Sequence, residues 1–280
     1  MSLSLTNVQQ TEFDALVKIE YRSRGFLLRD CIRLRTDIIG NTCQFRRVGQ
    51  VIANQVAYQN TIAIQDPGFA AATATLLKYA AGTAVDEIQD LTVNFDSKRE
   101  LAMVVAMAVG RRSDQILIDA FNANPGQTIL NGGTNVTYAK LRQLMQFFEE
   151  NAVPIEERYF AMSGNGLRAL MADDHIVSRF FTSNDAVATG TLNYRDLMSM
   201  NIRIIPTMTE GGLPLAANIR RNFAWHKMST GMAIGQDLRT EINYLPRETS
   251  WFVNGIFFAG AVVIDNRGVF RVDSDETVIP

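Results

Sequence analysis

The sequence has little of what disulfide-rich, metal-binding and membrane-spanning proteins need. It has two histidines and two cysteines in 280 residues, and Cys31 and Cys43 form no CxxC pair. These counts argue against a disulfide framework and a zinc site and indicate a reducing compartment. The longest apolar run, residues 101–109, has nine residues, whereas a membrane-spanning helix takes about 20. The N-terminus lacks the continuous apolar segment of a signal peptide, so we expect the chain to stay in the cytosol where it is made.

An excess of charge of one sign is also missing. The chain has 27 Lys plus Arg against 29 Asp plus Glu, a formal net charge of −2. This balance argues against a dedicated nucleic-acid or membrane-surface binder. The charges are nevertheless segregated along the chain. Residues 18–47 carry eight basic and three acidic side chains, a net charge of +5, whereas residues 48–94 carry one basic and four acidic side chains, a net charge of −3.

A long helix is predicted in the stretch SKRELAMVVAMAVGRRSDQILIDAFNAN, residues 97–124. Ser97 and Glu100 fit an S-x-x-E capping box and Pro125 stops the pattern, so the helix should run from about 97 to about 123. At 1.5 Å per residue it would be about 40 Å long. Its first half is apolar on every face, so we expect burial on all sides there, whereas residues 111–115 should reach water or partners. Such a helix is typical of a strut in an extended molecule.

An α/β pattern follows residue 137. It predicts an amphipathic helix over 138–154, which places Leu141, Leu144, Met145 and Phe148 on one face. A strand at 158–163, a short helix at 165–174 and a strand at 201–208 follow. The apolar runs of 250–276, with a D-N-R-G turn at 265–268, predict a closing hairpin or strands against the long helix.

The segment 48–94 indicates a polar, two-stranded excursion. Its first half alternates weakly, with Val56, Tyr58, Ile62 and Ile64 separated by Gln and Asn, and QDPGF at 65–69 supplies a turn. A lone hairpin is at best marginally stable in water. We therefore expect another chain to cover this excursion.

One motif is typical of a nucleotide site. Gly164, Gly166 and Ala169 form G-x-G-x-x-A between a predicted strand and a predicted helix, which is the context of a dinucleotide loop. The acidic residue expected at the end of a second strand has no clear counterpart, so a glycine-assisted turn is the preferred interpretation. His175 and His226 lack the spacing of metal ligands. The sequence therefore assigns no catalytic, cofactor-binding or metal-binding residue, and no cofactor is expected.

Four stretches give the sequence a resemblance to a known family. They are IIGNTCQFRRVG (38–49), DLTVNFDSKRELAMVVAMAVGRRSDQILIDAF (90–121), AWHKMSTGMAIGQDLRTEINYLPRETSWFVNG (224–255) and GAVVIDNRGVFRVDSDE (260–276). In this order, after a basic arm, they resemble the major capsid proteins of tailed bacteriophages, the Hong Kong 97 type of shell protein. The similarity is greatest to the short-tailed phage branch, and it covers nearly the whole chain.

The resemblance implies an α+β fold of the Hong Kong 97-like phage capsid type. That fold has an N-terminal arm, an extended loop, a peripheral domain with a long spine helix, and an axial α/β domain. Laid onto this sequence, the parts are an arm at 1–40, an extended loop at 41–92, the peripheral domain with its spine helix at 93–136, an axial domain at 137–245 and the return strands of the peripheral domain at 246–280.

The implied function is structural. Copies would assemble as pentamers and hexamers into the icosahedral head of a virion, around double-stranded DNA held non-specifically and with no membrane. A separate scaffolding protein and a portal are the other expected partners, because no long leading segment could act as a fused scaffold. Assembly is expected in the host cytoplasm.

Opposite charges on different copies should meet across subunit interfaces, where complementarity sets register more than affinity. The candidate contact residues are Arg46, Arg47, Asp86, Glu87, Arg111 and Arg112. Two alternatives stay open. One is an encapsulin-like compartment shell, which shares the fold, and the other is a nucleotide-binding α/β enzyme based on the glycine motif.

Overall fold

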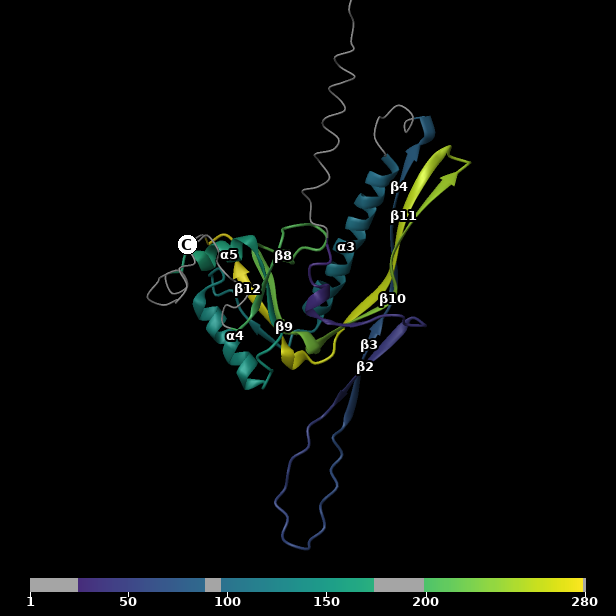
Figure 1. Cartoon of the computed structure of the whole chain (residues 1–280). Helices are drawn as coiled ribbons and strands as arrows, with labels where there is room; N and C mark the ends of the chain where they lie inside the picture. The colour runs from purple at the N-terminus through teal and green to yellow at the C-terminus, as the bar shows by residue number, and fades with distance from the viewer. Residues whose placement is uncertain (1–24, 89–96, 174–198, 279–280) are drawn as a thin grey trace, which may run out of the picture.

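The computed structural model describes residues 25–88, 97–173 and 199–278 of the chain. These residues form a four-stranded sheet with a long helix, a six-stranded sheet with two shorter helices, and a hairpin that projects from the body (Figure 1). No helix within these ranges is long and apolar enough to cross a membrane. The predicted α+β class is confirmed.

Helix α3, Ser97–Ala123, matches the predicted long helix at both ends. It lies along the strands β4, Leu77–Asp86, and β11, Ser250–Val263 (Figure 1). Buried side chains of its second half, among them Leu117 and Phe121, share one core with Phe257 of β11. Burying a side chain of this size contributes about 1.5–3 kcal/mol, so this contact fixes the helix on the sheet.

The sheet under α3 has the strand order β1-β10-β11-β4. Strand β10, Thr230–Leu245, pairs antiparallel with β11, and β1, Arg33–Arg35, pairs parallel with β10. Strand β4 pairs antiparallel with β11, from Leu77 opposite Ala259 to Asp86 opposite Ser250. Strand β11 therefore spans this sheet from end to end.

The second sheet has the order β5-β12-β9-β6-β7, and β8 pairs with β9. The strands are β5 Gln127–Ile129, β6 Arg158–Ser163, β7 Asn201–Ile205, β8 Leu215–Ala216, β9 Ile219–His226 and β12 Val269–Asp275. The strands predicted at 158–163 and 201–208 are thus confirmed as β6 and β7. Three short 3-10 helices join elements of the chain: η1 Arg29–Cys31, η3 Lys227–Ser229 and η4 Asn266–Gly268.

Helices α4 and α5 pack with this second sheet. Helix α4, Tyr138–Glu150, begins after Thr137, whose side chain accepts a hydrogen bond from the backbone N–H of Lys140. It buries Leu141, Leu144 and Phe148 in a second core, as its amphipathic pattern predicts. Helix α5, Gly164–Met171, follows directly on β6 and corresponds to the helix predicted at 165–174.

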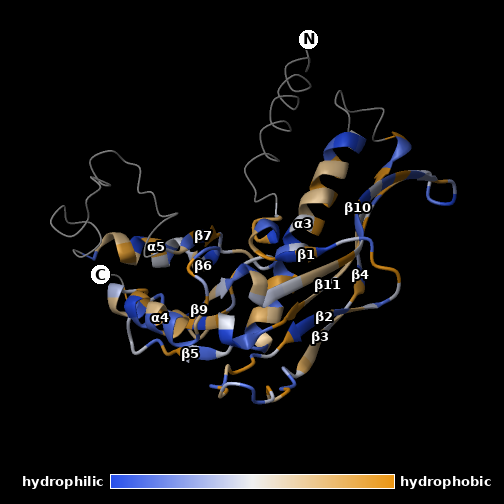
Figure 2. Cartoon of the chain, turned by 60° about the horizontal axis from the view of Figure 1, so that its bottom comes forward, coloured by the Kyte–Doolittle hydropathy of each residue, from blue (hydrophilic) through white to orange (hydrophobic). Residues whose placement is uncertain are grey.

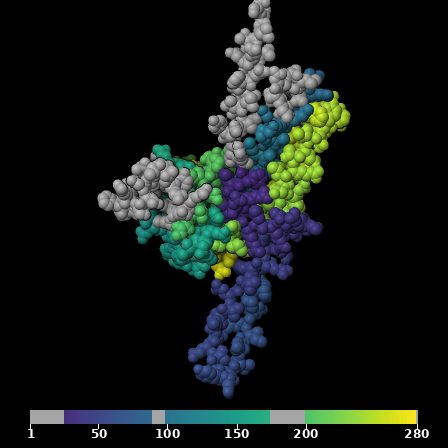
Figure 3. All heavy atoms as spheres, viewed as in Figure 1, coloured from purple at the N-terminus to yellow at the C-terminus, as the bar shows by residue number. Residues whose placement is uncertain are grey.

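The remaining strands form the hairpin. Strand β2, Thr42–Val48, pairs antiparallel with β3, Phe69–Thr75, and residues 49–68 connect them as a long loop. The backbone N–H of Gly49 donates to the carbonyl of Gly68 and closes the base of this loop. The loop extends away from both sheets (Figure 3), so the predicted two-stranded excursion is present at 42–75.

Of the two alternatives expected for the segment 250–276, strands against the long helix are confirmed, because β11 packs on α3. A closing hairpin does not form, because β11 belongs to the sheet under α3 and β12 belongs to the other sheet. The polar η4 segment redirects the chain between the two sheets. The range expected for the extended loop, 41–92, contains three strands, of which β2 and β3 pair with each other as the hairpin and β4 pairs with β11.

Candidate functional site

The hairpin loop presents a row of exposed apolar side chains. Tyr58 and Ile64 are fully exposed, and Ile52, Ile62 and Phe69 are each about three-quarters exposed. Figure 2 shows the projecting loop as a mixture of apolar and polar residues, away from either sheet. Soluble monomers rarely expose so many large apolar side chains in one place. Within the described ranges, no other part of the chain covers this loop.

Helix α3 carries a second exposed apolar surface, which corrects the expectation of burial on all sides. Met103 is 44% exposed and Val104 is 40% exposed, because the sheet covers only one side of the N-terminal half of the helix. The more polar C-terminal half is the buried one. Its Ser113 and Asp114 are buried, although residues 111–115 were expected to reach water or partners.

The candidate contact residues fall into three places. Arg46 and Arg47 lie on β2 at the base of the hairpin, and the guanidinium of Arg47 is 2.8 Å from the carboxylate of Asp265. Asp86 ends β4, at the far end of the four-stranded sheet. The adjacent Glu87 accepts a hydrogen bond from the hydroxyl of Tyr244. The structure therefore places the basic and the acidic candidates at opposite ends of β11.

The third place is the middle of α3, which holds Arg111 and Arg112. The guanidinium of Arg112 lies 4.7 Å from the ring centre of Tyr79 on β4 and 3.9 Å from the carboxylate of Glu210. The Cβ of Arg111 lies close to Gly211. Both arginines thus pack within their own subunit.

A recess of about 390 Å³ opens beside Arg46 and Arg47. Arg33, Arg267 and Asp265 line it as well, and sequence reasoning did not single them out. Asp265 and Arg267 belong to the D-N-R-G turn, which the sequence did predict. Their position beside β2 depends on long-range packing, which the local pattern does not encode.

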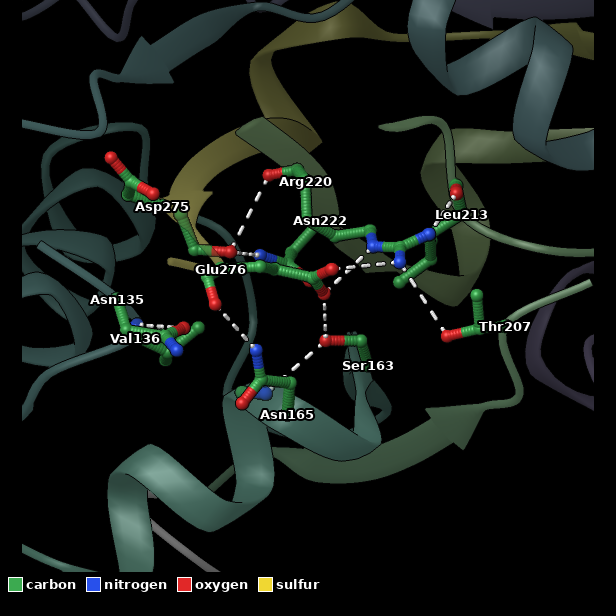
Figure 4. Close-up of polar contacts among 12 residues, drawn as sticks. Asn135, Val136, Ser163, Asn165, Thr207, Leu213, Arg220, Asn222, Asp275 and Glu276 are labelled. Atoms are coloured by element: carbon green, nitrogen blue, oxygen red, sulfur yellow. Dashed lines mark hydrogen bonds and ion pairs between the residues drawn. The ribbon is translucent and has the colours of Figure 1, made fainter. Parts of the chain in front are cut away.

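The glycine motif of the alternative enzyme hypothesis serves a different purpose in the structure. The Ser163 side chain caps α5 by accepting from the N–H of Gly166, and it donates to the Glu276 carboxylate at 2.9 Å (Figure 4). A Cβ at Gly166 would lie 3.0 Å from a methyl carbon of Val136, so glycine permits a close contact. The Glu276 carboxylate thus bonds the side chain that caps α5, next to the helix N-terminus at which a phosphate would bind.

Arg220 completes the network around Glu276. Its guanidinium donates twice to this carboxylate, at 2.8 Å each, and once to the carbonyl of Leu213 (Figure 4). These Arg220 bonds, opposed by burial and aided by the Ser163 hydroxyl, hold the pKa of Glu276 below its usual value. The carboxylate is therefore ionised at neutral pH and would repel a nucleotide phosphate. Among the described residues, no cluster of three or more His, Cys, Asp or Glu side chains could hold a metal ion.

Comparisons with known proteins agree with this geometry. A family model described as phage capsid protein matches residues 5–276. No curated protein matches the sequence. Among solved structures, the capsid of cyanophage P-SCSP1u has 15% identity and a TM-score of 0.74, covering 98% of this chain and 95% of its own.

Two further structures are similar over most of their length. The capsid asymmetric unit of cyanophage Pam1 has 14% identity and a TM-score of 0.71, covering 99% of this chain and 98% of its own. A structure from Mycobacterium phage Che8 has 16% identity and a TM-score of 0.66, covering 85% of this chain and 86% of its own. At these identities the structural likeness establishes the Hong Kong 97-like fold, and the family match covers nearly the whole chain.

Proposed function

The chain belongs to the phage capsid protein family, and from this premise we propose that it is a major capsid protein that builds an icosahedral head. Copies associate as pentamers and hexamers, which close into a shell around double-stranded DNA. The observation that carries this proposal is the hairpin loop, whose exposed apolar side chains no other part of the described chain covers. The role is structural and assigns no catalytic residue.

The driving force for assembly is the burial of apolar surface between neighbouring copies. Each side chain such as Ile52 or Ile64 gains only about 1.5–3 kcal/mol when it is fully covered. Every copy in a closed shell repeats this contact with its neighbours. The modest contacts therefore sum to a stable container. The exposed face of α3 with Met103 and Val104 is a second candidate for such a contact.

The partners and the location follow from the same role. A separate scaffolding protein guides assembly, a portal occupies one vertex, and the DNA is held through its phosphates without sequence preference. Assembly takes place in the host cytoplasm, and the mature protein resides in the virion. The division into arm, extended loop, peripheral domain and axial domain is proposed with the boundaries that the resemblance implies. Two strand pairings join these parts. Strand β4 of the extended loop pairs with β11 of the return strands, and β12 of the return strands pairs with β9 of the axial domain.

Sedimentation velocity with a crowding agent tests the proposal through the hairpin loop. The triple variant Ile52→Ser, Ile62→Ser, Ile64→Ser should remain a folded monomer under conditions in which the wild type forms large species. A matched control is Leu130→Ser, which removes a side chain that is 73% exposed outside the hairpin. Large species from the triple variant, at the level of the wild type and of the control, would contradict the proposal.

A further inference from the structure

The recess at the base of the hairpin has an excess of positive charge. Four arginines line it, Arg33, Arg46, Arg47 and Arg267, against the single carboxylate of Asp265. His226 also lines it, but burial lowers the pKa of its imidazole, and its Nδ1 accepts a hydrogen bond from the N–H of Met228. The imidazole is therefore neutral at neutral pH, and the recess has a net charge of +3.

The carboxylate inside the recess cannot neutralise all four arginines. Asp265 accepts two hydrogen bonds from the Arg267 guanidinium, at 3.2 and 3.0 Å, and one from the backbone N–H of Arg267. Arg47 adds an ion pair at 2.8 Å. Burial would raise the pKa of Asp265, but these contacts outweigh it and hold the pKa below its usual value. This carboxylate is thus ionised and fully engaged by Arg47 and Arg267.

Arg33 and Arg46 are the two arginines left over. Both side chains are exposed, and neither forms an ion pair with a carboxylate of the described chain. The guanidinium of Arg33 lies 5.8 Å from the ring centre of Phe45, which fixes its direction without supplying an anion. The carbonyls of Val153 and Pro154 on the opposite wall accept hydrogen bonds from Arg158. The recess therefore presents two guanidinium groups that lack a counter-charge.

The far end of the four-stranded sheet, at the end of β4, has an excess of negative charge. Among the described residues, Asp86–Glu87 is the one adjacent acidic pair in which neither carboxylate has a basic partner. In the pairs at 149–150, 156–157 and 275–276, one member bonds Arg158, Lys227 or Arg220. Asp86 and Glu87 are exposed, and their side chains accept from the N–H of Ile88 and the hydroxyl of Tyr244.

The two ends cannot meet within one subunit. Strand β11 begins opposite Asp86 and ends at Val263, two residues before Asp265. Its 14 residues span about 45 Å at 3.3 Å per residue. Only a second copy of the chain can therefore bring its acidic corner to the recess.

We propose that the recess binds the Asp86–Glu87 corner of a neighbouring copy, with Arg33 and Arg46 as the groups that receive its carboxylates. This proposal rests on the proposed function and specifies one of its contacts. A contact between unlike ends of the same molecule is heterologous, and repetition of such a contact closes into a ring when the rotation allows it. The contact therefore gives the capsomer a direction, in which each copy presents its corner to the recess of the next.

The charge of the recess favours a side chain over DNA. Two of its four arginines, Arg47 and Arg267, are engaged by the Asp265 carboxylate. Only Arg33 and Arg46 therefore remain for an anion, which suits a pair of carboxylates better than the row of phosphates on a duplex. Gln50, the second residue of the hairpin loop, lines the same recess, so this site is continuous with the apolar surface that a second copy covers. Such charge complementarity sets register and selects the correct neighbour, more than it adds affinity.

A charge-swap experiment on the full chain tests the contact. The variants are Arg33→Glu with Arg46→Glu, Asp86→Lys with Glu87→Lys, and the combination of all four changes. Assembly is measured as the fraction of protein in rings or shells, by sedimentation and electron microscopy in a crowding agent. We expect each double variant to assemble at least tenfold less than the wild type, because like charges then face each other. The quadruple variant should recover to within about threefold of the wild type, since opposite charges face again.

A matched control separates the specific contact from a change in net charge. In it, the arginine reversals are combined with Asp119→Lys and Glu150→Lys, two exposed acids that are hydrogen-bonded to glutamines. This control has the same net charge as the quadruple variant and should not recover assembly. Equal recovery in the control and in the quadruple variant would overturn the contact.

Other outcomes are equally decisive. If the wild type assembles and the arginine reversal assembles as well, the recess proposal fails while the capsid function stands. Normal assembly of that variant with a loss of DNA retention would assign the recess to phosphate and also overturn the contact. A wild type that assembles neither in a crowding agent nor with a scaffolding protein would contradict the proposed function itself. If thermal unfolding shows that the charge reversal unfolds the subunit, Arg33→Gln with Arg46→Gln provides the milder test. This variant should also assemble less than the wild type.

Discussion

The carboxylate of Asp114, in the middle of α3, accepts a hydrogen bond from the backbone N–H of Leu28 at 3.1 Å. Its other oxygen accepts from the N–H of Leu27 at 3.0 Å. At the same crossing, a Cβ on Gly25 would lie 2.1 Å from the carbonyl carbon of Gly110, so only glycine permits this close approach. The segment after residue 24 is therefore fastened to the long helix by one buried carboxylate.

This joint should make stability depend on pH. Burial raises the pKa of Asp114 to about 6, although the two backbone N–H groups lower it. The unfolded pKa is about 3.9, so the contribution is fully present below pH 4 and is lost as the pH rises through about 6. We expect the unfolding free energy of the wild type, relative to Asp114→Asn, to fall by about 2 kcal/mol between pH 4 and pH 7. Urea unfolding at several pH values measures this gap, and a gap that stays constant or widens would contradict the account.

The local signals of the sequence were sufficient to predict most elements. The S-x-x-E pattern at 97–100 and the stop at Pro125 predicted the bounds of α3, and the apolar spacing of Leu141, Leu144 and Phe148 predicted the buried face of α4. These features depend on neighbours within a few residues, so a sequence pattern contains them.

Long-range partners were not predictable in the same way. Nothing near Asp114 indicates that residues 27 and 28 will cover it, and nothing near Gly166 indicates that Glu276 will reach the same turn. The separate sheets of β11 and β12 depend likewise on packing across the whole chain. Of the candidate site, the sequence predicted a polar two-stranded excursion and Arg46 and Arg47, whereas the exposure of its apolar side chains and the recess that surrounds these arginines required the fold.

The hydrogen bonds of Glu276 with Arg220 and Ser163 should make a large contribution to the free energy of unfolding. Glu276→Ala leaves the Arg220 guanidinium, whose side chain is 4% exposed, without its carboxylate. Removing one partner of a buried ion pair costs about 3–5 kcal/mol, and we expect that loss in urea unfolding. Thr277→Ala is the control, because among the described residues the exposed Thr277 hydroxyl donates to the carboxylate of its neighbour Asp275 and takes no part in the Glu276 network. A loss below about 1 kcal/mol for Glu276→Ala would show that the network does not hold the segment.

The buried ammonium of Lys140 predicts a second stabilising contact. Its Nζ donates to the carbonyls of Asn131, Thr134 and Asp273, at 2.8 to 2.9 Å. Lys140→Met should cost about 1–3 kcal/mol of unfolding free energy, because the buried carbonyl of Asp273 loses its donor. The control is Gln143→Met on the exposed face of α4. Equal stability of the two variants would refute this role for Lys140.

The two halves of α3 should respond differently to substitution. Met103→Glu changes an exposed side chain, so we expect normal thermal unfolding of the subunit and a loss of assembly. Phe121→Ala removes a ring that is 1% exposed and stacks on Trp225 at 4.7 Å. It should destabilise the subunit itself by about 3–5 kcal/mol. Calorimetry and sedimentation together distinguish the two effects, and a folded Met103→Glu variant that assembles normally would exclude this face from the interface.

The central claim is that this chain builds a closed shell. Negative-stain electron microscopy of the purified protein, with and without a scaffolding protein or a crowding agent, tests that claim most directly. We predict closed shells, or rings of five and six copies, as the products of assembly. Monodisperse monomers under every condition would contradict the account.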